Sequence, residues 1–302
     1  MRLPPGLCRA ISLALLSCSV PGMTGCAWLL TSKRKLPVPV APSIVQTVTG
    51  EELVGRLNDQ WAKFETMTAK VDIQASHLQD KKGEATDYPT FRSVLLLRKP
   101  GMLRIRGLAP VVQSVLFDLG SDGTKFTLMV PPKSKAYTGF NAGRGKSANW
   151  YENLRPGFLF DAMMVRGLSE DELYSVTAET VTEEDATKKH LIARPEYVLS
   201  VMRRKAGTQE LAPVRIIRFH REDLMPYEQD LYDDKGALET QVIYGSYLDF
   251  HGMTYPGTIT LRRPQDEYEL VMGVETVTAN IPLKDSQFEV MVPEGTPVQK
   301  LE

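Results

Sequence analysis

Short runs in which apolar and polar residues alternate occupy most of the chain after residue 65. Leu103 and Ile105 alternate with arginines, and Leu270 and Met272 fall on one face of a later run. Turn sequences, such as Lys-Pro-Gly at residues 99–101, separate these runs. A period of two places successive side chains on opposite faces of an extended strand. The pattern therefore predicts many β-strands that each present one apolar face.

The predicted strands follow one another without the intervening helices that parallel neighbours require. They cover residues 70–76, 91–98, 103–106, 115–119, 126–130, 136–139, 191–202, 214–219, 228–232, 240–247, 257–261 and 268–277, with a short strand at 288–292. The order of strands, then helices, then strands predicts an α+β protein built on a large antiparallel sheet.

Two helical segments accompany this sheet. Residues 50–65 carry apolar residues at helical spacing after a capping residue, Thr49. Residues 149–175 read as two short helices or a helix–loop, followed by a further turn that begins with a capping box of Ser169 and Glu172. These segments are the main candidates to cover the apolar face of the sheet.

A large antiparallel sheet with few helices to cover it favours an apolar cavity under a movable helical cover. Methionine side chains adapt to varied apolar partners, which suits such a cover. The candidate lid and ligand-lining residues are Phe158, Phe160, Met163, Met164, Leu103, Ile105, Leu270 and Met272. In the alternative, which these residues by themselves favour, the helices fill an ordinary core.

The N-terminal segment has the layout of an export signal, with arginines, a short apolar run and small residues in residues 1–25. The apolar run ends well short of the ~20 residues that span a bilayer. Met-Thr-Gly-Cys at residues 23–26 resembles the bacterial lipobox, in which Cys26 becomes the acylated mature N-terminus. Cys18 is an alternative acylation site, and the remaining alternatives are secretion without acylation and no processing at all. Residues 26–49, with basic residues and prolines, predict an extended tether.

Residues that carry catalysis form no recognisable motif in this sequence. The four histidines are far apart, and neither a nucleophile motif nor a phosphate-binding glycine loop occurs. All three cysteines lie within the first 26 residues, which leaves none for a metal site in the folded body. The balance of 36 basic and 37 acidic residues lacks the basic excess typical of nucleic-acid binding. We therefore expect no enzymatic activity, metal, cofactor or nucleic-acid partner.

Three stretches resemble the periplasmic lipoprotein-carrier superfamily that includes LolA, LolB and RseB. Residues 97–105 (LRKPGMLRI) are similar to its strand–turn–strand, in which a Lys-Pro-type turn precedes an aliphatic-Arg strand. Residues 123–128 resemble its next hairpin, and residues 280–288 its closing element. The resemblance covers roughly residues 51–298, and the anchored N-terminus resembles LolB rather than the soluble carrier.

The resemblance implies that residues 50–302 form an unclosed half-barrel with a helical lid, whose concave face binds acyl chains. It implies an envelope protein that binds lipid or acylated lipoprotein, with a lipid anchor in the membrane and an envelope protein as a further potential partner. Ala27, instead of an inner-membrane retention Asp, favours the periplasmic face of the outer membrane. The apolar segment 108–112 is where a membrane-contacting loop would lie. A regulatory sensor like RseB and a structural or assembly lipoprotein with a filled core stay open as alternatives.

Overall fold

The computed structural model describes residues 38–42, 44–79, 83–141, 156–184, 187 and 190–301. The predicted signal segment, with Cys18 and Cys26, and most of the predicted tether lie outside these residues. None of the described helices is long and apolar enough to cross a membrane.

The chain divides into two units. The smaller unit comprises residues 1–40 and 184–192, and its described part contains a parallel bridge between Val40 and Ile192. The larger unit comprises residues 41–183 and 193–302 and contains both α-helices and the two apolar cores.

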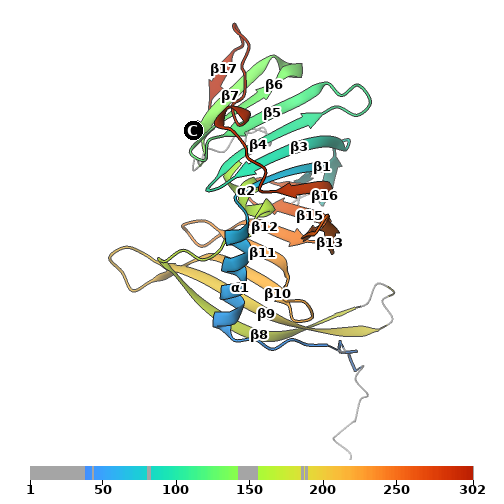
Figure 1. Cartoon of the computed structure of the whole chain (residues 1–302), viewed down its shortest axis with the longest axis vertical. Helices are drawn as coiled ribbons and strands as arrows, with labels where there is room; N and C mark the ends of the chain where they lie inside the picture. Colours follow the sequence, from blue (N-terminus) through green and yellow to red (C-terminus); the bar gives the residue numbers. More distant parts are fainter. Residues whose placement is uncertain are drawn as a thin grey trace, which may run out of the picture. The chain divides into compact units, whose positions relative to one another are not determined.

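The larger unit is built on a twisted β-sheet, as the alternating sequence predicts (Figure 1). Its strands are β1 (Thr66–Gln79), β2 (Glu84–Asp87), β3 (Phe91–Arg98), β4 (Met102–Leu108), β5 (Val115–Ser121), β6 (Lys125–Val130), β7 (Lys135–Phe140), β8 (Glu172–Glu184), β9 (Leu191–Arg204), β10 (Leu211–His220), β11 (Pro226–Tyr232), β12 (Leu238–Tyr244), β15 (Thr258–Arg263), β16 (Tyr268–Ala279) and β17 (Val298–Lys300). A separate hairpin consists of β13 (Tyr247–Phe250) and β14 (Met253–Pro256).

Within the described residues, these fifteen strands form one sheet that is not closed into a barrel. Its order is β17-β7-β6-β5-β4-β3-β1-β16-β15-β12-β11-β10-β9-β8, and β2 pairs with β1 at the side. The α+β class and the unclosed half-barrel are thus confirmed. The sheet is mixed rather than purely antiparallel, because β17 pairs with β7 in parallel.

The sheet consists of two meanders, one formed by β1 and β3 to β7 and the other by β8 to β12, β15 and β16. They meet where β1 pairs with β16. β16 lies between β1 and β15, although it follows β1 by nearly 200 residues (Figure 1). In the antiparallel register Ile73 is opposite Met272 and Ala75 is opposite Leu270. Because side chains opposite each other share a face, this pairing places the apolar faces of both meanders on the same side.

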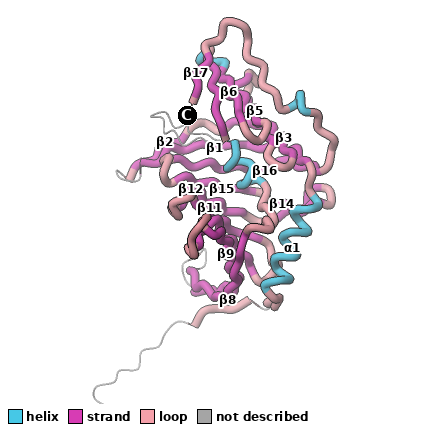
Figure 2. Tube along the Cα trace, turned by 90° about the vertical axis from the view of Figure 1, so that its left-hand side faces the viewer, coloured by secondary structure: helices cyan, strands magenta, loops and turns pink. Residues whose placement is uncertain are grey.

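The first helix, α1 (Gly50–Lys63), begins as the sequence predicts. The Thr49 hydroxyl accepts a hydrogen bond from the Glu52 amide, and the Glu52 carboxylate accepts one from the Thr49 amide. The buried face of α1, including Leu53 and Leu57, packs in an apolar cluster with residues of β9 and β10. Figure 2 shows α1 running beside the β9 end of the sheet. The assignment of α1 to core packing agrees with this placement.

The second helix, α2 (Pro156–Met163), is shorter than the predicted segment 149–175. Residues 149–155 lie outside the described part, and the prediction of helix up to residue 175 is wrong. A turn follows Ser169, whose amide donates to the Glu172 carboxylate, but β8 begins at Glu172. The Glu172 carboxylate also accepts from Arg215 of β10, so it ties the start of a strand to the sheet instead of capping a helix.

The predicted strand at 288–292 is also wrong. Phe288 is buried as the C-cap of a short 3-10 helix (Asp285–Gln287), and the next strand in the structure is β17.

Candidate functional site

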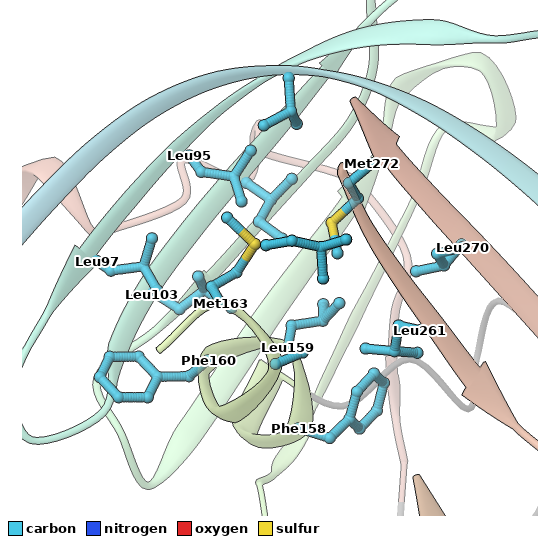
Figure 3. Close-up of a cluster of buried hydrophobic side chains, with 14 of the residues drawn as sticks. Leu95, Leu97, Leu103, Phe158, Leu159, Phe160, Met163, Leu261, Leu270 and Met272 are labelled. Carbon is cyan, nitrogen blue, oxygen red and sulfur yellow. The ribbon is translucent and has the colours of Figure 1, made fainter. Parts of the chain in front are cut away.

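Helix α2 lies against the apolar side of the sheet, and all of its eight residues except Gly157 and Asp161 are buried. Its buried residues are Pro156, Phe158, Leu159, Phe160, Ala162 and Met163. In Figure 3 the α2 side chains of Phe158, Leu159, Phe160 and Met163 lie among leucines and a methionine that belong to strands on both sides of the helix. A helix with apolar side chains over most of its surface is stable where other protein covers that surface. α2 is therefore the helical lid of the half-barrel.

The eight residues predicted from the sequence to form a lid and a lining meet in one buried cluster. Phe158, Phe160 and Met163 belong to α2 and Met164 follows it, Leu103 and Ile105 belong to β4, and Leu270 and Met272 belong to β16. This cluster includes side chains more than 160 residues apart in sequence, which the pairing of β1 with β16 brings together.

An apolar cavity of about 540 Å³ lies on this face of the sheet. Side chains of β1, β3 to β6 and β16 form its walls, and Leu159 of α2 covers one side. Of the eight predicted residues, Ile105, Leu270 and Met272 line it. Lys133 is the one charged residue among its described lining residues. A wall of this kind can hold a hydrocarbon chain but provides almost no hydrogen-bonding groups.

A second cavity of about 380 Å³ lies at the C-terminal end of the lid. Met163 and Met164, from the end of the lid, line it together with Met67, Met225 and Met253. Much of the remaining wall consists of three tyrosines and of Trp61 and Phe64, which lie at the end of α1 and directly after it. Leu103, Phe158 and Phe160 line neither of these two cavities and fill the core between the lid and the sheet.

The sequence did not lead us to predict one contact of the lid, which a buried arginine makes from beneath it. Arg263, the last residue of β15, lies with its guanidinium over the Phe158 ring. Burial by itself lowers the pKa of Arg263. Tyr268, Asp266 and Glu239 together outweigh burial and raise the pKa above its usual value, so the guanidinium stays charged. The signal was available, because Arg263 continues the inward-facing positions of Ile259 and Leu261. A charge at a core position of an alternating strand indicates a specific partner.

A second cation–π contact supports the lid from the side of α1. The Lys99 ammonium lies 4.2 Å from the centre of the Trp61 ring and also donates to the Trp61 carbonyl. The edge of Trp61 meets Phe160 of α2 at a centroid distance of 6.4 Å. Burial lowers the pKa of Lys99, and the Glu65 charge opposes that shift. The lid therefore contacts a cation at Phe158 and an aromatic ring at Phe160.

The described residues contain no cluster of His, Cys, Asp and Glu side chains that could hold a metal ion. The lid region presents mainly apolar side chains, together with tyrosine hydroxyls, the two cation–π contacts and an ion pair between Asp161 of α2 and Arg166.

Comparison with family models finds no match, and neither does comparison with curated proteins. Comparison with solved structures finds proteins of similar fold. A LolA superfamily protein from Nitrosomonas europaea matches with a TM-score of 0.51 and 12% identity, over 81% of this chain and 99% of its own.

Two further structures match with lower scores. A DUF1329 family protein from Desulfovibrio piger has a TM-score of 0.49 and 15% identity, over 80% of this chain and 95% of its own. A domain described as an outer membrane lipoprotein-sorting protein, from Vibrio parahaemolyticus, has a TM-score of 0.46 and 12% identity, over 78% of this chain and 94% of its own. We rest the fold assignment on the Nitrosomonas protein. The chain has the LolA-like fold that the sequence resemblance implies.

Proposed function

We propose that this protein is a non-enzymatic, lipid-anchored envelope protein that binds acyl chains of lipids or lipoproteins in the 540 Å³ cavity. The observation that carries the proposal is the composition of the cavity wall. Side chains of six strands and one lid leucine surround it, and Lys133 alone among the described lining residues is charged. The LolA-like fold agrees with such a role.

The wall chemistry selects a long hydrocarbon chain over a polar ligand. Each methylene moved from water into the cavity contributes about 0.8 kcal/mol, so affinity grows with chain length. A polar ligand would lose its hydrogen bonds to water and find few replacements. Lys133, the cationic residue of the lining, suits the carboxylate or phosphate that ends an acyl lipid.

The test introduces a carboxylate into the cavity wall. Leu116 lines the cavity and is only half-buried, so Leu116→Glu should leave the protein folded. We expect the variant to lose most of its affinity for a fluorescent C16 fatty acid, because a buried carboxylate disfavours the chain. The matched control is Leu211→Glu, at an exposed leucine of β10 outside the cavity. The proposal fails if the wild type binds no fatty acid, or if both variants bind it equally well.

We also propose that Cys26 carries the lipid anchor and that the protein faces the periplasm from the outer membrane. Two acyl chains are sufficient for stable membrane attachment. We expect Cys26→Ala to release the protein from membranes or to leave the precursor uncleaved. Cell fractionation and mass spectrometry of the mature N-terminus check this, and a terminus at Cys18 would contradict it.

A further inference from the structure

The 380 Å³ cavity at the C-terminal end of the lid has a wall unlike that of the 540 Å³ cavity. Its described lining residues include five methionines and five aromatic residues, and Val165 is the one branched aliphatic residue among them. The 540 Å³ cavity is lined by eight leucines, isoleucines and valines, with three aromatic residues and one methionine. The two walls therefore suit ligands of different shape.

The accessible part of this wall consists mainly of aromatic rings and thioethers. Trp61, Phe64 and Tyr247 are half-buried, and so are Met225 and Met253, so each keeps part of its surface open. Trp61 belongs to α1 and Phe64 is its C-cap, whereas Tyr247 begins β13. Met225 precedes β11, and Met253 begins β14. Rings and thioethers from separate elements thus line one space.

The hydroxyl donors of two tyrosines in the wall are already used. The Tyr247 hydroxyl donates to the Pro226 carbonyl at 2.7 Å, and the Tyr255 hydroxyl donates to the Met163 carbonyl at 2.6 Å. These bonds hold the two rings in place. The body of a ligand in this cavity therefore gains contacts with rings and sulfur atoms rather than hydrogen bonds from these hydroxyls.

Rings and thioethers favour an aromatic ligand over an aliphatic chain. Aromatic rings pack edge-to-face or offset against one another, and such pairs add to the effect of burial alone. Methionine sulfur makes favourable contacts with ring edges, and the flexible side chain adjusts to the outline of a ring. A rigid planar ligand also loses less conformational freedom on binding than a hydrocarbon chain. The volume lies within the range of about 300–1,000 Å³ that is usual for small-molecule sites.

The charge in the wall indicates the charge of the ligand. Lys63 is the one charged residue among the described lining residues, and its side chain is exposed. An anionic group of a ligand can pair with this ammonium group. We propose that this cavity binds a small aromatic anion, such as an aryl carboxylate, with its ring beside Trp61, Met225 and Met253 and its charge at Lys63.

The test observes the methyl signals of the full chain labelled with [methyl-¹³C]methionine. Each signal is assigned by its loss when that methionine is replaced by leucine, a change that nearly conserves volume. The probe is 2-naphthoate, whose ring current shifts the signal of a methyl group that it contacts. We expect a saturable shift at Met225 and Met253, and no shift at Met291, which is exposed outside the cavity.

Undecanoate distinguishes an aromatic site from a general apolar one, because it has the same carboxylate and the same number of carbon atoms as 2-naphthoate. We expect it to bind beside Met225 and Met253 at least tenfold more weakly than 2-naphthoate. Met272 lines the 540 Å³ cavity, so its signal reports binding there separately. Failure of this second site and failure of the proposed acyl-chain site are therefore distinguishable in one spectrum.

Lys63→Gln tests the role of the charge. We expect the variant to bind 2-naphthoate about threefold more weakly than wild type, the effect of one exposed charge pair. The uncharged 2-naphthalenemethanol should bind both proteins equally. The matched control is Lys70→Gln, at an exposed lysine of β1 outside the cavity, which should bind 2-naphthoate as wild type does.

Three outcomes would overturn the proposal. In the first, 2-naphthoate shifts neither the Met225 nor the Met253 signal, or shifts the Met272 signal alone. In the second, undecanoate binds beside Met225 and Met253 as tightly as 2-naphthoate, which means that the wall does not select an aromatic ring. In the third, Lys63→Gln and Lys70→Gln bind 2-naphthoate equally, which means that the ligand's charge is not recognised.

Discussion

The guanidinium carbon of Arg263 lies 4.3 Å from the centre of the Phe158 ring, so a cation of β15 contacts the first turn of the lid helix. The same guanidinium is fixed in place by Asp266 at 2.6 Å and by the Thr240 hydroxyl at 3.0 Å. A cation–π contact that is shielded from water contributes about 2 kcal/mol. Arg263 therefore joins lid and sheet through a contact that is stronger than an exposed one.

A double-mutant cycle tests this contact. Arg263→Met alone leaves the buried Asp266 unpaired, so its cost in unfolding free energy exceeds that of the cation–π contact. Phe158→Leu removes the ring and keeps apolar bulk. We expect a coupling energy of about 1–2 kcal/mol between the two substitutions in urea unfolding of all four proteins. Additivity within about 0.5 kcal/mol would show that the contact contributes nothing.

A second buried charge, Asp118, stabilises the meander that begins with β1. Asp118 of β5 accepts hydrogen bonds from Arg104 at 2.7 and 2.9 Å and from Arg106 at 3.0 and 3.2 Å. Burial raises the pKa of Asp118, but the two arginines outweigh burial and hold the pKa below 3.8. A carboxyl with a lowered folded pKa stabilises the fold above its unfolded pKa and loses that contribution as pH falls through the folded value.

Asp118→Asn should therefore lower the unfolding free energy at pH 7 by about 3 kcal/mol, since it leaves buried guanidinium unpaired. The variant should also lose less stability than wild type when pH falls below about 4. Urea unfolding at several pH values measures both effects. The control is Asp72→Asn in an exposed pair with Arg92, for which we expect less than about 1 kcal/mol. Equal costs for the two substitutions would contradict the role of Asp118.

A pH-sensitive contact lies on β10 and β11. The rings of His220 and Tyr227 stack at a centroid distance of 4.1 Å. Burial is the main cause that lowers the pKa of His220 below 6.5; Arg194 acts in the same direction, while Asp223, Glu222 and Glu196 oppose it. Between the folded pKa and 6.5 the unfolded chain binds more protons, so stability rises with pH across this window.

We expect wild type to lose stability as pH falls below about 6.5, and His220→Gln to lose less over the same range. Thermal melts of both proteins between about pH 5 and pH 7 test this expectation. Parallel pH profiles for the two proteins would mean that His220 titrates normally.

The strand framework could be predicted because burial on one face leaves a period of two in the sequence. In β16 the buried positions Tyr268, Leu270 and Met272 alternate with less buried ones, as predicted. β8 was not predicted, because it lacks burial on one face. Most of its residues from Glu172 to Glu184 are exposed, so no apolar alternation records the strand. Its position at the end of the sheet order explains this exposure.

The candidate site could be predicted only in part. Apolar composition and helical spacing identified the residues that meet beneath the lid, including Phe160 and Leu103. Whether these residues leave a cavity depends on how side chains from distant strands fit together, which composition does not record. Leu159, the lid residue that lines the 540 Å³ cavity, was absent from the predicted residues for this reason.

The last prediction concerns the loop between β4 and β5, within the segment where the resemblance implies a membrane-contacting loop. Pro110 lines the apolar cavity, and the next two residues, Val111 and Val112, are 98% and 73% exposed. Val111 has a φ of +69°, which is strained for a β-branched residue. A hydrogen bond from the Gln113 amide to the Ala109 carbonyl closes this turn. Backbone strain that presents two apolar side chains to solvent, beside the cavity, indicates a functional surface.

We expect Val111→Ser with Val112→Ser to reduce co-flotation with phospholipid vesicles and to slow the transfer of a fluorescent fatty acid to them. Each valine gives up about 1.5 kcal/mol or more of apolar burial in the bilayer, so vesicle affinity should fall at least tenfold. Affinity for the fatty acid in solution should not change, because neither valine lines the cavity. The control is Met291→Ser, at a side chain exposed to 88% outside this loop. If the control lowers vesicle binding as much as the double variant does, general surface hydrophobicity rather than this loop makes the contact.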